Sequence, residues 1–174
     1  MSVQSRLFDL GRHLEADDRE AVLWLFDRPL SDNTAEGFAN GLCPNVGEPG
    51  IPIPVLLEAV FLVGRLDLIS KLFLLDVGFI VGRLRSSPSY FSPYKHLMLS
   101  INRQLSEKDV KGLVFLTADQ LGRKRDGSPT FLRWLTRMEK AALVSPSDCL
   151  VLRDLLRAVS RRDVAKIVAA NTPG

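Results

Sequence analysis

Cysteine and histidine, the side chains most often used for metal binding and nucleophilic catalysis, are scarce in this chain. Its 174 residues include two of each. Cys43 and Cys149 lie far apart and have no second candidate ligand at metal-binding spacing, so they predict neither a metal site nor a disulfide framework. His13 and His96 have no companion nucleophile at a readable spacing. The sequence therefore predicts no catalytic residue, metal site or cofactor, and its cysteine usage favours a reducing compartment, the cytosol.

Long uncharged apolar runs are also missing. The most apolar stretch, residues 51–75, is interrupted by Glu58, Arg65, Asp67 and Lys71, whereas a membrane helix needs about 20 nearly uncharged residues. The beginning of the chain carries charges throughout and has no apolar core typical of a signal peptide. No glycine-rich phosphate-binding motif is present. The sequence therefore predicts no membrane span and no phosphate-binding loop.

Charge is unevenly distributed along the chain, whose formal net charge is +3. Residues 1–86 hold 8 Lys/Arg and 12 Asp/Glu, a net charge of −4, and residues 87–174 hold 15 and 8, a net charge of +7. Opposite fields steer association, which suits head-to-tail contact with copies or relatives of the chain. The alternative is that the two halves neutralise each other within one molecule. The basic run at residues 122–127 is more typical of a solvated loop, so nucleic acid is not predicted as a partner.

Apolar residues recur every three or four positions through most of the chain, which predicts an all-helical protein. Residues 41–54 contain three Gly and four Pro and predict a loop, with Pro54 as the first residue of the next helix. Helices are also expected at about residues 65–74 and 161–170. Ser106 followed by Asp109 predicts a helix N-terminal capping arrangement.

The second half of the sequence repeats the first. An offset of 96 residues aligns these pairs: Val55 with Val151, Val63 with Val159, Arg65 with Arg161, and Asp67 with Asp163. Upstream, an offset of 91 aligns Asp18 with Asp109. The pattern indicates two copies of an all-helical unit of roughly 80 residues.

Each copy places an Arg-x-Asp pair in an apolar setting. A half-buried arginine needs carboxylates to satisfy its planar set of donors. Residues two apart on a helix do not face each other, so each charged group is expected to meet another element, and the acid at the start of the second helix is the natural third member. The sequence thus predicts two charge triads, Asp18–Arg65–Asp67 and Asp109–Arg161–Asp163. They orient helices, present a face to a partner, or do both.

This repeated pattern resembles the death effector domain of the death-fold superfamily. The stretches DDREAVLWLF, GRLDLI, SYFSPY, FLTAD, PTFLRW and SRRDV occur in this order and are similar to those of gammaherpesvirus viral FLIPs, the FLICE-inhibitory proteins. The resemblance implies an all-α fold of two tandem death-fold antiparallel helix bundles packed as one compact unit. It implies a first death effector domain at residues 1–84, a junction at 85–93 and a second domain at 94–170.

The resemblance also implies a function without catalysis. Tandem death effector proteins of this kind join the adaptor FADD and procaspase-8 in the host cytoplasm, so we expect a decoy that blocks the initiator caspase and inhibits apoptosis. The alternative, which can coexist with it, is a scaffold that binds the IKK regulatory subunit gamma and activates NF-κB.

Two apolar groups are the candidate contact residues. Phe115 and Leu116 match the Phe-Leu pair that related proteins insert into a neighbour's groove, although one of the two could equally belong to the core. The face around Ile53, Leu57 and Phe61 is the candidate surface for the IKK subunit, provided that it forms an exposed apolar groove. Both groups join the charge triads as predicted protein-binding residues.

Overall fold

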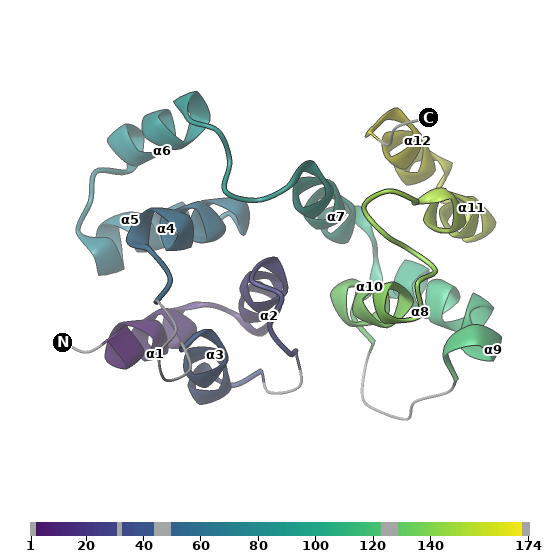
Figure 1. Ribbon diagram of the computed structural model, residues 1–174, viewed down its shortest axis with the longest axis horizontal. Coiled ribbons are helices and arrows are strands. Elements are labelled where there is room, and N and C mark those ends of the chain that lie inside the picture. Colours follow the sequence, from purple (N-terminus) through teal and green to yellow (C-terminus); the bar gives the residue numbers. More distant parts are fainter. Residues whose placement is uncertain (1–2, 31–32, 44–49, 123–128, 172–174) are drawn as a thin grey trace. The chain divides into compact units, whose positions relative to one another are not determined.

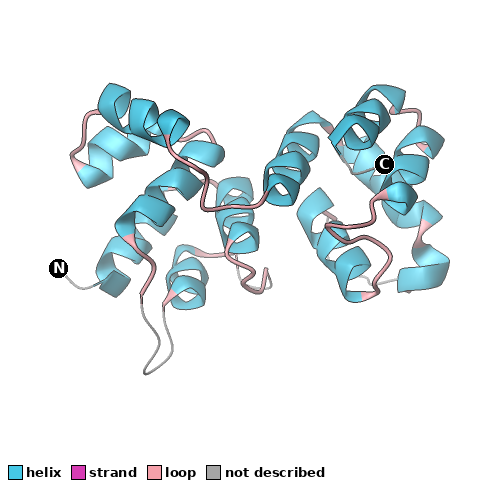
Figure 2. Cartoon of the chain, turned by 45° about the horizontal axis from the view of Figure 1, so that its top comes forward, coloured by secondary structure: helices cyan, strands magenta, loops and turns pink. Residues whose placement is uncertain are grey.

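The computed structural model describes residues 3–30, 33–43, 50–122 and 129–171. Within these ranges the chain is helical, and the one β-type feature is an isolated bridge between Ser145 and Asp148 (Figures 1 and 2). The chain divides into two compact units, Met1–Lys95 and His96–Gly174. The all-helical prediction is confirmed. No helix of the described ranges is both long and apolar enough to cross a membrane.

The described part of unit 1 forms these helices: α1 Val3–His13, α2 Ala16–Leu25, α3 Ala35–Leu42, α4 Ile53–Leu62, α5 Leu66–Phe73 and α6 Val77–Ser86. Their starts follow from local chemistry. Asp17 and Asp18 occupy the first turn of α2, where carboxylates interact favourably with the helix dipole. The Thr34 side chain accepts a hydrogen bond from the Gly37 N–H and caps α3. The core is apolar and includes Leu10, Val22, Phe38, Val60 and Leu68.

Helix α4 begins one residue earlier than the sequence predicts. Pro52 is its N-terminal cap and Pro54 is the second helical residue, a position where the missing N–H costs no intrahelical bond. The expected loop at 41–54 is also shorter than predicted, because residues 41 and 42 belong to α3. Residues 44–49 of that loop lie outside the described residues.

Unit 2 is built from α7 Pro93–Gln104, which begins in unit 1, followed by these helices: α8 Glu107–Leu116, α9 Ala118–Leu121, α10 Phe131–Lys140, α11 Leu150–Ala158 and α12 Arg162–Asn171. Ser106 and Asp109 form the predicted capping arrangement at the start of α8, each side chain accepting from the other's backbone N–H. Trp134 is buried in the core, and its indole N–H donates to the Thr117 hydroxyl at 2.9 Å.

The sequence repeat pairs α4 with α11 and α5 with α12, so the two units are built on one plan. Each also has an element of its own. In unit 1 the helix α6 follows the motif helix α5, and in unit 2 the single-turn helix α9 precedes α10 (Figure 1).

Hydrogen bonds and a ring contact hold the segment after α6 against the rest of unit 1. Glu58, which is buried on α4, accepts hydrogen bonds from the Tyr90 N–H at 2.9 Å and from the Ser89 hydroxyl. The Phe91 ring packs edge-on against Phe26, with 5.5 Å between the ring centroids. These contacts help to satisfy a buried carboxylate, and they define the path of the chain after α6.

Candidate functional site

Arg65 joins three helices of unit 1. Its Nε and Nη2 donate to the two carboxylate oxygens of Asp67, both at 3.0 Å. Its Nη1 donates to Asp18 Oδ2 at 3.3 Å and to the carbonyl oxygen of His13 at 2.9 Å. The guanidinium therefore connects the first turn of α5, the first turn of α2 and the last residue of α1.

Arg161 makes the same set of bonds in unit 2. Its Nε and Nη2 donate to the Asp163 carboxylate at 3.0 and 2.9 Å. Its Nη1 donates to Asp109 Oδ2 at 2.6 Å and to the carbonyl oxygen of Gln104, the last residue of α7, at 2.8 Å. The triad contacts expected from the sequence thus occur in both units, whereas their role in protein binding stays a prediction.

One step of the sequence argument was wrong. Arg65 lies at the N-cap of α5, outside the helix, with φ −97° and ψ 60°. Its side chain can therefore donate a hydrogen bond directly to Asp67 in the first turn. The rule that residues two apart on a helix do not face each other applies only when both are helical. The sequence also gave no indication of the carbonyls of His13 and Gln104, because every residue carries such an acceptor.

A left-handed residue precedes each arginine and turns the chain toward the motif helix. In unit 1 it is Gly64, with φ 80°, and at the aligned position of unit 2 it is Ser160, with φ 65°. A side chain disfavours this conformation, and no atom lies within 4 Å of a Cβ built on Gly64. The backbone alone therefore sets the cost of a substitution at this turn.

Exchanging the two turn residues is expected to have opposite effects. Gly64→Ala should lower the free energy of unfolding of unit 1 by about 1 kcal/mol, and Ser160→Gly should raise that of unit 2 by up to about 1 kcal/mol. Chemical denaturation of each variant against the parent chain measures both changes. If both variants changed the free energy of unfolding in the same direction and by the same amount, the backbone conformation at these positions would not be the cause.

The arginines hold the neighbouring carboxylates ionised. Hydrogen bonds from Arg161 lower the pKa of Asp163 to about 2, against 3.8 for an ordinary aspartate. Hydrogen bonds from Arg65 likewise lower the pKa of Asp67. Both carboxylates remain largely exposed, with 62% and 58% of their side chains accessible. Each triad thus presents a fixed negative charge at the surface.

Asp109 is the more buried acid of the second triad. Burial acts to raise its pKa, but hydrogen bonds from the Ser106 N–H and the Arg161 guanidinium outweigh that effect, and the net pKa is lowered. The same carboxylate therefore caps α8 and binds the arginine, so two structural tasks depend on its charge.

Stability is expected to fall in acid through these groups. A carboxylate whose folded pKa lies below its unfolded value of 3.8 stabilises the fold above that pH, and the contribution is lost as the pH falls toward the folded value. The Asp163 contribution should therefore disappear between about pH 4 and pH 2. Melting temperatures of the parent and of Asp163→Asn across this window test the prediction. The variant should show the shallower decline, and parallel curves would contradict the assignment.

Phe115 and Leu116 lie on the surface of unit 2, at the end of α8. Their exposed fractions are 76% and 42%, while Val110 and Leu113 of the same helix are buried. The alternative that one of the pair belongs to the core is therefore wrong. A large apolar pair left exposed in this way is typical of a contact surface.

The predicted apolar face of α4 is not a continuous groove. Ile53 is 40% exposed and Phe61 is half-buried, but Leu57 is only 6% exposed and belongs to the core of unit 1. The expectation that Leu57 meets a partner is corrected by this burial. The reason is that α4 is apolar on most of its circumference, so the sequence did not distinguish its inner from its outer face.

An open groove that the sequence did not indicate lies between α1 and α3. Its walls are formed by Gln4, Ser5, Phe8, Glu36, Ala39 and Asn40. Phe8 is partly exposed there, and the guanidinium of Arg12 lies 5.9 Å from the centre of its ring. The lining combines the Phe8 ring with polar side chains, among which Gln4 Nε2 donates to Asn40 Oδ1 at 3.1 Å. Such a mixed surface is typical of a protein contact.

The described residues do not include a group of His, Cys, Asp and Glu side chains that could hold a metal ion. Cys149 is buried, and burial raises the pKa of its thiol, which keeps it protonated and poorly nucleophilic. Most of the basic run at residues 122–127 lies outside the described residues. The candidate sites are the two triads, the exposed apolar residues and the groove between α1 and α3.

Comparison with known proteins decides the family. A model of the death effector domain matches residues 94–172. The viral FLICE protein of Human herpesvirus 8 type P (isolate GK18) is 34% identical over 168 residues, an alignment that covers 97% of this chain and 89% of that protein. The chain belongs to the viral FLIP family of death effector domain proteins. This family consists of non-catalytic regulators of apoptosis, so the chain is not an enzyme.

Two further relatives bear on this viral FLIP. The mouse CASP8 and FADD-like apoptosis regulator is 30% identical over 153 residues, which cover 87% of this chain but 32% of that protein. The crystal structure of the viral FLIP MC159 matches with a TM-score of 0.76 at 22% identity, covering 98% of this chain and 96% of that chain. The latter likeness shows the fold, whereas the domain bounds 1–84, 85–93 and 94–170 stay predictions.

Proposed function

We propose that this viral FLIP is a decoy adaptor of the host cytoplasm. It joins death-receptor assemblies through its death effector domains and blocks recruitment or activation of the initiator caspase. The observation that carries the proposal is the exposed Phe115–Leu116 pair, which lies within the residues matched by the death effector domain model. An aromatic side chain that is three-quarters exposed contributes to stability mainly when a partner covers it.

The partner class follows from the chemistry of the surfaces. The open groove between α1 and α3 of unit 1, which contains the partly exposed Phe8 ring, is the proposed receptor for such a pair from a neighbouring death effector domain. The acidic first half and the basic second half favour stacking in one direction, because each domain then meets a field of opposite sign. FADD and procaspase-8, which carry these domains, are the proposed partners.

The experiment that tests the proposal uses purified proteins. The full chain is added to FADD and procaspase-8, and both co-assembly and processing of procaspase-8 are measured. Co-assembly with reduced processing supports a decoy. Absence of binding to FADD and to procaspase-8 contradicts it, and so does binding that leaves processing unchanged.

The alternative scaffold function receives no support from the α4 face, because Leu57 is buried and Phe61 is half-buried, which leaves Ile53 as the one exposed member of the predicted set. Adding the IKK regulatory subunit to the same binding assay tests it. Capture of that subunit with no binding to FADD or procaspase-8 would overturn the decoy proposal and restore the NF-κB function.

A further inference from the structure

Helix α6 is weakly integrated into unit 1. None of its residues is buried, which is true of no other described helix of that unit. Its main backbone neighbour is α5, the helix that precedes it (Figure 1), and its apolar residues Val77, Ile80, Val81 and Leu84 are half-buried. The helix therefore has a half-buried apolar side and an exposed side.

The outward side of α6 and the turn before it expose large apolar residues. Phe79 is 63% exposed and Leu74 is 86% exposed, and Leu75 between them is also exposed. Leu74 adopts a left-handed conformation with φ 55°, which disfavours a branched side chain. This conformation caps the C-terminus of α5, and the large apolar side chains that it and the following residues leave exposed are typical of a surface that another surface covers.

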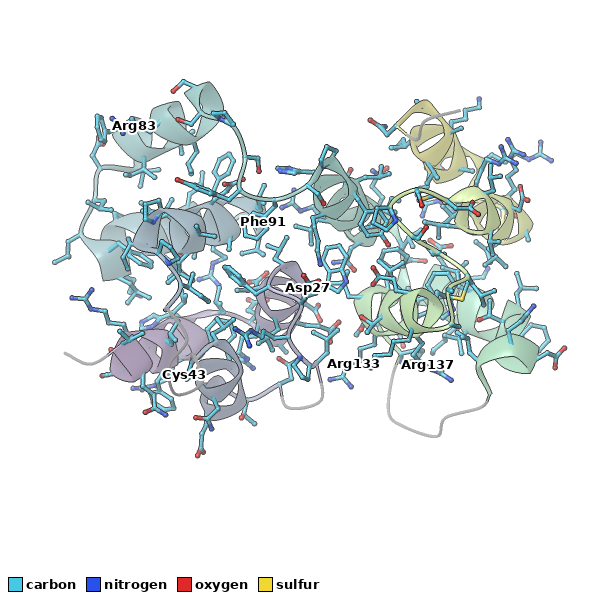
Figure 3. All side chains as sticks on the ribbon, viewed as in Figure 1. Asp27, Cys43, Arg83, Phe91, Arg133 and Arg137 are labelled. Atoms are coloured by element: carbon cyan, nitrogen blue, oxygen red, sulfur yellow. The ribbon has the colours of Figure 1, made fainter. Side chains whose placement is uncertain are left out.

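Charges of opposite sign flank this apolar surface. Asp76 precedes α6. Arg83, which is labelled in Figure 3, lies in its last turn. Asp76 is the N-cap of α6 and Arg83 follows Phe79 by four residues, so the acid lies at the start of the helix and the arginine lies beyond the ring. The Arg83 guanidinium carbon lies 5.8 Å from the centre of the Phe79 ring. Along the helix axis the surface is therefore first negative, then apolar and then positive.

We propose that α6 pairs with α6 of a second copy of this chain in an antiparallel, two-fold arrangement. Such a pair places Asp76 of each copy against Arg83 of the other and brings the two Phe79 rings together at the centre. A parallel pair would oppose like charges. The antiparallel pair also sets the two helix dipoles in opposition, which is the favourable orientation.

The second copy is the occupant because the surface is self-complementary. In a two-fold interface, a residue of one copy meets a different residue of the other copy, and the reverse contact also forms. The negative and the positive residue must therefore lie at similar distances from the centre, and Asp76 and Arg83 lie three and four residues from Phe79. Gly82 lies one turn beyond Phe79, and no atom lies within 4 Å of a Cβ built on it, which leaves room for the partner's ring. Two-fold pairing closes on itself and gives a dimer, unlike head-to-tail stacking.

The test is a charge exchange followed by sedimentation velocity on the full chain. Asp76→Arg and Arg83→Asp should each weaken the dimerisation constant by at least about tenfold, because each reverses a charge at two symmetric contacts. The double variant Asp76→Arg/Arg83→Asp should return to within about threefold of the parent. An equimolar mixture of the two single variants should recover parental affinity as a heterodimer, because both of its contacts between positions 76 and 83 then join opposite charges.

Matched controls make each outcome decisive. Arg85→Asp makes the same change of charge two residues from Arg83, on a different side of α6, and should leave dimerisation unchanged. Phe79→Ser should abolish it, and circular dichroism melting confirms that each variant is folded. A parent chain that stays monomeric up to about 1 mM, or a double variant no better than the singles, would overturn the proposal.

Binding to FADD, measured on the same variants, separates this inference from the proposed function. The α6 variants are expected to bind FADD as the parent does, since Phe115 and the α1–α3 groove are unchanged. Loss of FADD binding in every α6 variant that fails to dimerise would contradict the assignment of α6 to a separate, two-fold contact.

Discussion

Phe115→Asp is expected to abolish binding to death effector domain partners while leaving the fold intact. The side chain is 76% exposed, so its replacement removes little buried area and should change the melting temperature only slightly. At an interface, by contrast, an aspartate would bring an unpaired charge into an apolar contact, which costs several kcal/mol and weakens binding by at least about a hundredfold. Titration of FADD and procaspase-8 against the variant measures the effect.

A matched variant controls for a general effect of added negative charge on the surface. Leu150→Asp changes another exposed apolar residue of unit 2, on α11 rather than α8, and is expected to keep partner binding. Equal losses in the two variants would show that added negative charge, and not the Phe115 contact, governs binding. A folded Phe115→Asp variant with parental affinity would refute the role of the pair.

Arg65→Ala is expected to lower the free energy of unfolding of unit 1 by roughly 2 kcal/mol. The side chain is 25% exposed, so the loss should lie between the small effect of a surface ion pair and the 3–5 kcal/mol of a buried one. The variant leaves Asp18 and Asp67 as neighbouring like charges and removes the donor to the His13 carbonyl. The corresponding fall in melting temperature is on the order of 10 °C.

Two further variants separate the effect of the positive charge of Arg65 from that of its hydrogen-bond geometry. Arg65→Lys keeps the charge but cannot donate to Asp67, Asp18 and His13 at once, so it should recover only part of the stability. Arg85→Ala removes an exposed arginine of α6 and should have little effect. Full recovery with lysine would show that the bidentate geometry is unimportant. Undiminished partner binding by a folded Arg65→Ala variant would leave the triad a purely structural role.

The helices, the repeat and the charge triads could be predicted from the sequence because each is a local or periodic property. Apolar spacing determines where helices form, and the aligned positions of Arg65 and Arg161 bring the same partners into reach in both units. The sequence did not predict that Arg65 lies at the N-cap of α5 and not inside the helix. That position depends on the left-handed turn at Gly64.

Which apolar residues face outward was decided only by the tertiary structure. Helices α4 and α8 both contain consecutive apolar residues that cover more than one side of the helix. Packing then buries Leu57 and exposes Phe115, although both stand in similar apolar runs. The physical reason is that burial depends on which neighbouring elements cover a face, and those neighbours lie far away in the sequence. The sequence by itself therefore determined the helices and the charged contacts that join them, and the packing of those helices decided which surfaces are left for a partner.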